Sequence, residues 1–273
     1  MKISPLAAVD PKARLADDVE VGPFCVIGPD VTIGGGTRLL NSVTVIGHTT
    51  IGRNNVIHPN AVIGSMPQDR SYKSAPTRVE VGDNNVIREA CTIHRGTEKG
   101  GGLTRVGDNN MLMVNVHLGH DVHMGSNCTI ANNLMTGGHV QIRNGVVIMG
   151  GVGINQFVRV GDYAFIGGLS RIHHDVPPFC KIDGPDLFRG VNIVGLRRAG
   201  FTEDDVESIE AACRRLFYRE TPFALAMAEF NTMNGLNSRV KHMIDFLRER
   251  DMGKHGRYLE SLREKKPSPP LAS

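Results

Sequence analysis

The sequence predicts a parallel β-helix followed by a small α-helical domain. Between Val9 and Ile172 an aliphatic residue recurs at almost every sixth position in two runs, glycine often follows it, and the spacing of apolar residues becomes helical near residue 201. The chain has 273 residues, of which 32 are glycine and none is tryptophan. This composition favours many tight corners around a narrow core of aliphatic side chains.

The six-residue frame runs twice, with a shift of one residue between the two runs. The first run contains Val9, Leu15, Val21, Ile27, Ile33, Leu39, Val45, Ile51, Ile57 and Ile63, and it returns at Val81, Ile87 and Ile93. The second run contains Val106, Leu112, Leu118, Met124, Ile130, Thr136, Ile142, Ile148, Ile154, Val160, Ile166 and Ile172. Each hexad predicts a short strand and a corner, and three hexads close one triangular coil. Residues 18 apart therefore stack one strand spacing, about 4.8 Å, apart.

Two polar or glycine-rich stretches leave the frame. They lie near 66–78 and 94–105 and are expected to project from the prism as loops, either as passive insertions or as carriers of binding groups. We therefore predict a β-helix over 1–190, a helical domain over 191–265 and a disordered tail over 266–273.

Four helices are expected in the second domain. The first opens at Thr202, which forms a capping box with Asp205. The second opens at residues 221–222, a Thr-Pro pair typical of an N-cap and first turn. A fourth short helix covers residues 258–263, and the third has an apolar stripe at helical spacing. The members of that stripe are Val240, Met243, Ile244 and Leu247.

The composition also excludes several classes of protein. The net charge is only +3, so no nucleic-acid partner is expected. The five cysteines form no CxxC pair, which predicts reduced thiols in a cytoplasmic protein. The N-terminus lacks the apolar core of a signal peptide. No apolar run approaches the roughly 20 residues of a membrane span, so no integral membrane segment is expected.

The most informative stretch reads NVHLGHDVHMG and begins at Asn115. His117 precedes an interior position of the frame, so its side chain faces outward. His120 lies just past a corner glycine. Adding 18 gives Gly138, which we expect directly above His120 on the next coil, with His139 beside it. Three histidines and a bare backbone N–H would thus gather on the outside of the prism.

Two chemistries fit this cluster. In the first, His120 is a general base whose tautomer is set by Asp121 or another acceptor, and the Gly138 N–H stabilises an oxyanion. In the second, His117, His120 and His139 bind zinc and activate water, as in the β-helical carbonic anhydrases. The spacing does not decide between these two hypotheses.

A site on the outside of a prism needs a cover to exclude water. A flat prism face invites association of identical prisms, so we expect a homotrimer with the site in a cleft between subunits. A trimeric scaffold without catalysis is a third interpretation of the same features.

Several longer motifs are more specific than the hexads. They read IGPDVTIGGGT, PTRVEVGDNNVIRE, NNMLMVNVHLGHDV, ANN followed by GGHV, DVPPF, and GVNIVGLRRAGF. In these segments the chain resembles the acyl-carrier-protein–UDP-N-acetylglucosamine O-acyltransferase family, which begins lipid A synthesis. The resemblance spans nearly the whole chain and implies that the β-helix is left-handed.

The resemblance implies a specific reaction. His120 removes the proton from the 3-hydroxyl of a UDP-N-acetylglucosamine-type sugar, and the oxygen attacks an (R)-3-hydroxyacyl thioester on acyl carrier protein. The Gly138 amide receives the developing charge, and no metal or redox cofactor is needed. The acyl donor is carried on the phosphopantetheine arm of the carrier protein.

The resemblance also assigns binding residues. His117 and His139 contact the sugar or the carrier arm, with help from Gln156, while Gln68 and Asp69 reach the sugar. The nucleotide diphosphate is held by Asn192 and Arg198. The acyl chain lies in a groove floored by Gly150 and Gly168, and glycine at position 168 leaves this groove open for a long chain.

One alternative within the same fold stays open. The chain has Asn155 and Val194 where the family usually has histidine and glutamate, and both positions touch the substrate pockets. A UDP-3-amino sugar as acceptor would make the reaction an N-acylation with the same base.

Overall fold

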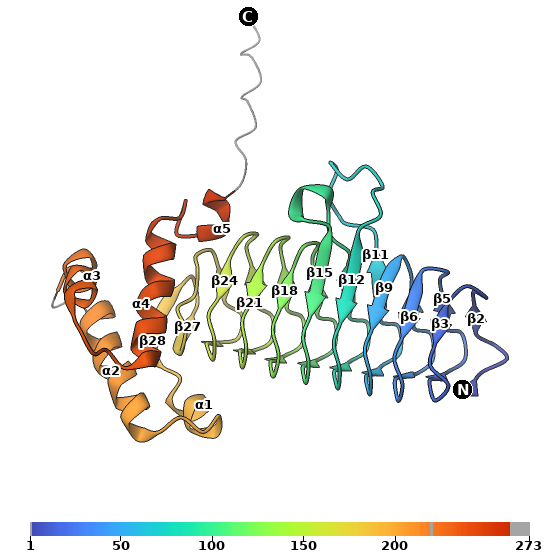
Figure 1. Cartoon of the computed structure of the whole chain (residues 1–273), viewed down its shortest axis with the longest axis horizontal. Helices are drawn as coiled ribbons and strands as arrows, with labels where there is room; N and C mark the ends of the chain where they lie inside the picture. The colour runs from blue at the N-terminus through green and yellow to red at the C-terminus, as the bar shows by residue number, and fades with distance from the viewer. Residues whose placement is uncertain (1, 219–220, 263–273) are drawn as a thin grey trace, which may run out of the picture.

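The chain forms a long prism with a helical domain at one end. The computed structural model describes residues 2–218 and 221–262. The N-terminus lies at the far end of the prism, away from the helices (Figure 1). The expected tail, 266–273, lies outside the described residues.

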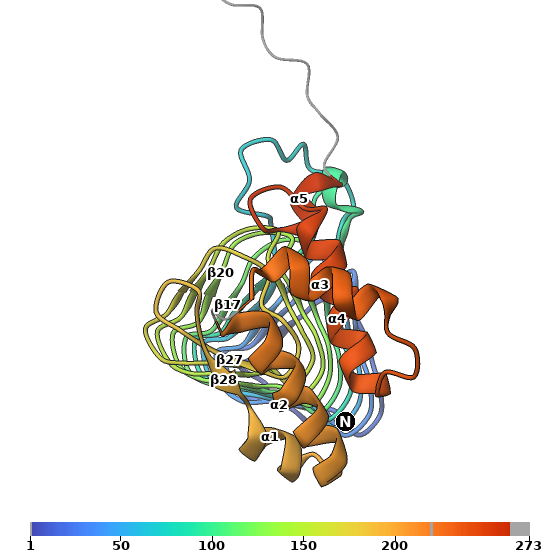
Figure 2. The same cartoon turned by 90° about the vertical axis from the view of Figure 1, so that its left-hand side faces the viewer.

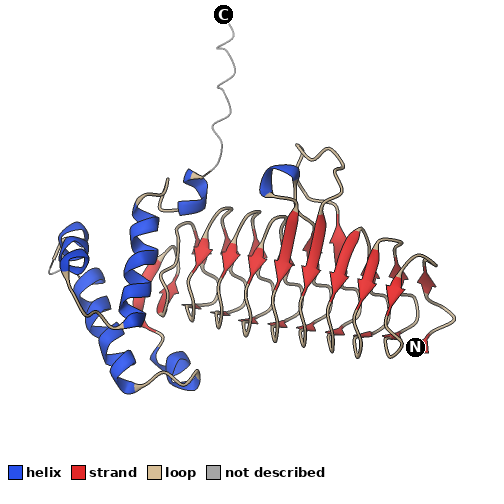
Figure 3. Ribbon diagram, in the orientation of Figure 1, coloured by secondary structure: helices blue, strands red, loops and turns tan. Residues whose placement is uncertain are grey.

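Three sheets form the faces of the prism, and their strands are parallel except for the last strand of the first sheet (Figure 3). Sheet A contains β1 (Lys2–Ile3), β4 (Glu20–Val21), β7 (Arg38–Leu39), β10 (Val56–Ile57), β13 (Val86–Ile87), β16 (Met111–Leu112), β19 (Thr129–Ile130), β22 (Val147–Ile148), β25 (Phe165–Ile166), β27 (Cys180–Asp183) and β28 (Leu187–Val191). Sheet B contains β2 (Ala8–Val9), β5 (Val26–Ile27), β8 (Thr44–Val45), β11 (Val62–Ser65), β14 (Thr92–His94), β17 (His117–Leu118), β20 (Met135–Thr136), β23 (Gly153–Ile154) and β26 (Arg171–Ile172). Sheet C contains β3 (Arg14–Leu15), β6 (Val31–Ile33), β9 (His48–Ile51), β12 (Arg78–Val81), β15 (Leu103–Val106), β18 (His123–Met124), β21 (Gln141–Ile142) and β24 (Arg159–Val160).

The register confirms the predicted stacking of residues 18 apart. On sheet B, His117 pairs with Met135, Met135 with Gly153, and Gly153 with Arg171. The predicted β-helix is therefore correct. The hairpin of β27 and β28 is antiparallel and closes sheet A at the helical end, a feature that the hexad frame does not contain.

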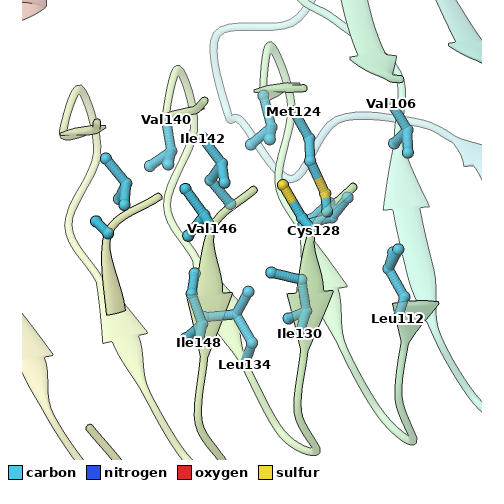
Figure 4. Close-up of a cluster of buried hydrophobic side chains, with 14 of the residues drawn as sticks. Val106, Leu112, Met124, Cys128, Ile130, Leu134, Val140, Ile142, Val146 and Ile148 are labelled. Atoms are coloured by element: carbon cyan, nitrogen blue, oxygen red, sulfur yellow. The ribbon is translucent and has the colours of Figure 1, made fainter. Parts of the chain in front are cut away.

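The core contains a second row of side chains beside the predicted frame. Ile130, Ile142 and Ile148 of the frame point into the prism, and so do Cys128 and Val146 two residues before a frame position (Figure 4). Successive side chains in a strand alternate between faces, so residues two apart both face inward.

Thr136 is the polar exception in the frame. It is buried, and its hydroxyl accepts a hydrogen bond from the backbone N–H of Gly119 at 2.9 Å. The same hydroxyl lies 3.3 Å from the His117 carbonyl, to which it donates. The interior threonine thus anchors the corner that precedes His120.

Two loops leave the prism between sheet B and sheet C. The first covers 66–77, between β11 and β12, and the second covers 95–102, between β14 and β15. The second contains the short 3-10 helix η1 (Glu98–Gly100). Both loops project from the same long edge, here called the B–C edge (Figure 1).

The helical end contains α1 (Ile193–Arg198), α2 (Glu203–Phe217), α3 (Phe223–Thr232), α4 (Ser238–Asp251) and α5 (Tyr258–Ser261). Seen along the prism, α5 lies on the side of the two loops and α1 on the opposite side (Figure 2). The Thr202 hydroxyl caps α2 as predicted, by accepting from the Asp205 N–H. The short α1 was not predicted, because six residues are too few to show a helical period. Within the described residues, no helix is of the length and apolarity that crossing a membrane requires.

Candidate active site

A cleft of about 680 Å³ lies on the B–C edge, between the two loops and α5. Its lining includes Gln68, Asp69, Lys99, His120, Asp121, His123, His139, Gln141, Gln156, Phe157, Leu259 and Leu262. Most of these residues come from consecutive coils at one corner, because every coil returns the chain to the same edge.

His120 and Asp121 form a hydrogen-bonded pair on the floor of the cleft. Nδ1 of His120 lies 2.8 Å from Oδ2 of Asp121. A carboxylate can only accept from the ring, so this contact puts the proton of a neutral His120 on Nδ1 and leaves Nε2 able to accept a proton. The sequence left the orienting group open, and the structure identifies it as Asp121.

Asp121 is itself held by the second loop. Its carboxylate is buried and accepts hydrogen bonds from the backbone N–H of Thr97 at 2.9 Å and from the Thr97 hydroxyl at 2.7 Å. The Asp121 N–H donates to the hydroxyl of Thr104 at 2.8 Å. Gly100 lies against the carboxylate so closely that a Cβ there would come within 2.0 Å of Asp121 Cγ. The loop therefore fixes the carboxylate while excluding water from it.

Gly138 lies directly against the His120 ring, as the 18-residue spacing predicts. A Cβ on Gly138 would lie 2.3 Å from Cε1 and 2.6 Å from Nε2 of His120. Among the described residues, no acceptor takes a hydrogen bond from the Gly138 N–H. Within the described part of the chain, this N–H therefore lies unpaired beside a ring that can accept a proton. An N–H in such a place can stabilise an oxyanion.

His139 lies on the other side of the pair. Its ring stacks on Phe157 with a centroid distance of 4.4 Å, and its Nδ1 is 3.7 Å from Oδ2 of Asp121. The His139 N–H donates to the His120 carbonyl at 2.9 Å, which joins the two coils at this corner.

His117 lies apart from this group. Its Nδ1 is 2.8 Å from the hydroxyl of Thr92, and its ring meets the edge of His94 at 5.3 Å. Burial, with the nearby His94 and His120, lowers the pKa of His117, so its neutral form is favoured.

The zinc alternative requires three histidines at one point. Among the described residues, the ligand atoms that lie within 4.8 Å of one another belong to His120, Asp121 and His139, and His117 is not among them. The Asp121 carboxylate is already engaged by Thr97. This geometry does not favour the three-histidine zinc site.

The first loop brings two predicted residues to the cleft. Gln68 and Asp69 line its wall opposite α5. The Asp69 carboxylate accepts from the N–H and the hydroxyl of Ser71 at 2.8 and 2.9 Å. These hydrogen bonds, above all that from the N–H, lower the pKa of Asp69 and keep it charged.

Four predicted residues lie elsewhere on the chain. Gly150 and Gly168 are at the edge between sheets A and B, outside the lining of the cleft. A Cβ on Gly168 would lie 3.4 Å from the Gly150 carbonyl oxygen, so the two glycines are neighbours. Asn192 and Arg198 belong to the α1 region, on the side of the molecule opposite the cleft (Figure 2).

Asn192 also has a local role. It is buried, its side-chain oxygen accepts from the Gly195 N–H at 3.3 Å, and its side-chain nitrogen donates to the Tyr163 carbonyl at 2.9 Å. These contacts cap α1 and join it to the prism. The exposed Arg198 lies in the last turn of the same helix.

Sequence reasoning missed several residues of the site. Phe157 follows His139 by 18 positions, so the repeat itself contains the signal that could have found it. The repeat contains no such signal for Thr97, Leu259 and Leu262, because these residues lie in a loop and in a helical segment outside the frame.

The prism and the His120–Asp121 pair define the class of protein. Residues 103–138 match the model of bacterial transferase hexapeptide repeats. Together with the fold and the solved structures it resembles, this match identifies a hexapeptide-repeat acyltransferase built on a left-handed parallel β-helix.

The particular family follows from longer matches. Residues 175–256 match the family model described as UDP-N-acetylglucosamine O-acyltransferase, domain 2. The chain is 41% identical over 247 residues to the acyl-carrier-protein–UDP-N-acetylglucosamine O-acyltransferase of Halorhodospira halophila, covering 90% of this chain and 96% of that protein. It is 43% identical to the protein of the same name from Xanthomonas axonopodis, covering 90% and 94%. The chain belongs to the acyl-carrier-protein–UDP-N-acetylglucosamine O-acyltransferase family.

Solved structures agree with this assignment. The UDP-N-acetylglucosamine acyltransferase of Francisella novicida superposes with a TM-score of 0.86 at 37% identity, covering 90% of each chain. The corresponding enzyme of Bacteroides fragilis gives a TM-score of 0.86 at 37% identity, covering 90% of this chain and 96% of that one.

Proposed function

We propose that this protein transfers an (R)-3-hydroxyacyl chain from acyl carrier protein to the 3-hydroxyl of UDP-N-acetylglucosamine, the first step of lipid A synthesis. The observation that carries the proposal is the contact of His120 with both Asp121 and Gly138. Membership of the family supports the choice of substrates.

The proposed mechanism uses both sides of the His120 ring. Asp121 holds Nδ1, and Nε2 accepts the proton of the sugar hydroxyl as its oxygen attacks the thioester carbon. The carbonyl oxygen gains negative charge beside the Gly138 N–H. When the tetrahedral intermediate collapses, the carbon–sulfur bond breaks and His120 returns the proton to the departing carrier thiol. No metal or redox cofactor enters these steps.

The surrounding residues have proposed binding roles. Asp69 is charged and lines the cleft with Gln68, which suits hydrogen bonds to sugar hydroxyls. His139 and Gln156 line the same cleft, where they are proposed to contact the sugar or the carrier arm. His117 has a lowered pKa and bonds to Thr92 outside the lining of the cleft, so its proposed contact with substrate is the least direct of this set.

We further propose that the active unit is a homotrimer with sites shared between subunits. Gly150 and Gly168 are proposed to hold the acyl chain, and Asn192 and Arg198 the diphosphate. Both pairs lie away from the His120 cleft of their own chain. A neighbouring copy that brings one chain's groove to the other chain's base would complete the site, which supports the trimer.

A cytoplasmic location is proposed on the state of the thiols. All five cysteines are free and buried, and burial raises the pKa of Cys91 to about 11 and of Cys128 to about 12. Unpaired thiols of this kind are typical of a reducing compartment.

The experiment that tests the function is a matrix of acceptors and donors. Purified protein is incubated with UDP-N-acetylglucosamine or its 3-amino analogue and with acyl carrier proteins bearing 3-hydroxyacyl chains of graded length, and products are identified by mass spectrometry. We expect an ester at the 3-position with the 3-hydroxy acceptor. Turnover confined to the 3-amino sugar would favour the N-acyltransferase instead, and no turnover with any pair would reject both.

A further inference from the structure

The helix α5 forms the wall of the cleft that faces the first loop. Leu259 and Leu262 line the same cleft as His120. They are three residues apart and so lie on one side of the helical turn. Leu262 is 62% exposed, so most of its apolar surface is available to a ligand.

The segment around α5 is fastened to the prism by backbone and side-chain hydrogen bonds. The Asp175 N–H donates to the Gly256 carbonyl at 2.8 Å, and the Tyr258 N–H donates to Oδ2 of Asp175 at 3.1 Å. Arg257 donates to the His173 carbonyl at 3.0 Å. These bonds join α5 to the corner that lies one coil beyond Gln156 and Phe157 on the cleft floor.

A buried cation strengthens this attachment. Arg159 is 2% exposed and donates to Oδ2 of Asp175 at 2.7 Å and also to Glu249 of α4. Its guanidinium lies between the rings of Phe246 and Tyr258, at 4.3 and 4.7 Å from their centroids. Two carboxylates and two rings hold the buried Arg159 guanidinium in one position. Because one of these rings belongs to Tyr258, the same contacts hold α5 in place.

The anchor and the cleft share one coil of the prism. Arg159 follows Phe157 by two residues and pairs across sheet C with Gln141, which lines the cleft. The position of α5 is therefore set relative to the residues that surround His120.

We propose that Leu259 and Leu262 bind the thioester-linked arm of the acyl donor, and that Arg159 and Tyr258 are positioning residues for this contact. The proposal rests on the acyltransferase function proposed above. It adds α5 to the donor site and assigns it to the arm, since the acyl chain is proposed to lie in the glycine groove at another edge.

The chemistry of the two walls favours the donor over the sugar. The wall opposite α5 carries Gln68, Asp69 and Lys99, whose polar groups suit an acceptor rich in hydroxyls. Leucine offers no hydrogen bond, so a sugar placed against Leu259 and Leu262 would lose its hydrogen bonds to water without replacement. The alkyl portions of a carrier arm have no such hydrogen bonds to lose.

The test compares the KM values of the two substrates. The double variant Leu259→Ser, Leu262→Ser is expected to raise the KM for acyl carrier protein about tenfold, the equivalent of one partly buried leucine contact. The KM for UDP-N-acetylglucosamine and the preference for acyl-chain length are expected to stay unchanged. The matched control is Leu6→Ser, since Leu6 is 61% exposed and lies on the N-terminal coil.

The positioning role of Tyr258 is tested by changing its ring, which lies over the Arg159 guanidinium. Tyr258→Phe keeps this ring and is expected to behave as the parent protein, whereas Tyr258→Ala is expected to raise the KM for the carrier without changing that for the sugar. The inference would be overturned if the KM for the sugar rose, if the preference for acyl-chain length changed, or if the leucine variants behaved like Leu6→Ser. A parent protein without transferase activity would instead reject the proposed function.

Discussion

At the scale of the residue, the candidate site depends on one glycine. Gly138 lets the coil above His120 approach the imidazole ring, and its N–H has no acceptor among the described residues. Any side chain at this position would push the ring away from Asp121. The proposed base and the proposed oxyanion donor therefore lie in contact because Gly138 has no Cβ.

This coupling predicts the effect of Gly138→Ala. The added Cβ would lie 2.3 Å from the His120 ring, so the ring must move. We expect turnover to fall by about 100-fold or more, the usual contribution of a positioned base, while the protein stays folded. Steady-state kinetics and thermal unfolding measure the two effects.

The matched control for this substitution is Gly28→Ala. A Cβ on Gly28 would meet its nearest atom at 3.4 Å, an ordinary contact. Gly28 directly follows β5, which lies near the N-terminal end of the prism (Figure 1). Equal activity of the two variants would contradict the proposed role of Gly138.

At the scale of the element, the second loop supports the His120–Asp121 pair. The loop 95–102 leaves the prism one coil before His120 and folds back so that Thr97 donates two hydrogen bonds to Asp121. Asp121 has a φ of +58°, an uncommon value for a residue with a side chain, and these bonds help to hold it there. The loop is therefore part of the candidate site and is not a passive insertion.

The prediction at this scale concerns the Thr97 hydroxyl. Thr97→Val keeps the shape of the side chain but removes one hydrogen-bond donor to a buried carboxylate. Because the free energy of such a hydrogen bond corresponds to about a tenfold change, kcat should fall about tenfold. Thr97→Ser keeps the hydroxyl and should retain most of the activity. If valine and serine variants have the same kcat, the loop does not act through Asp121.

At the scale of the whole molecule, one chain carries two separated halves of the proposed site. His120 lies on the B–C edge, whereas Gly150 and Gly168 lie on the A–B edge and Arg198 lies on α1. A trimer would have a mass near three times 29.7 kDa, which light scattering after gel filtration measures.

Mixed trimers test whether subunits share a site. His120→Ala and Arg198→Ala subunits are each expected to be poorly active alone. After denaturation and joint refolding in equal amounts, random assembly should place an intact His120 beside a neighbour's intact Arg198 in about one quarter of the sites. Activity should rise towards that fraction of the parent value. No recovery from mixed trimers of confirmed composition would show that each chain forms its own site.

The sequence by itself determined the prism, the stacking of His120 under Gly138 and the place of His120 on the outside of the prism. These features depend only on the 18-residue period, because a β-helix places residues of fixed separation above one another. The tertiary structure decided that Thr97 holds Asp121, that His117 turns towards Thr92, and that α5 lines the cleft. Loops and docked helices do not follow the period, so their positions depend on hydrogen bonds and buried charges between segments far apart in the chain.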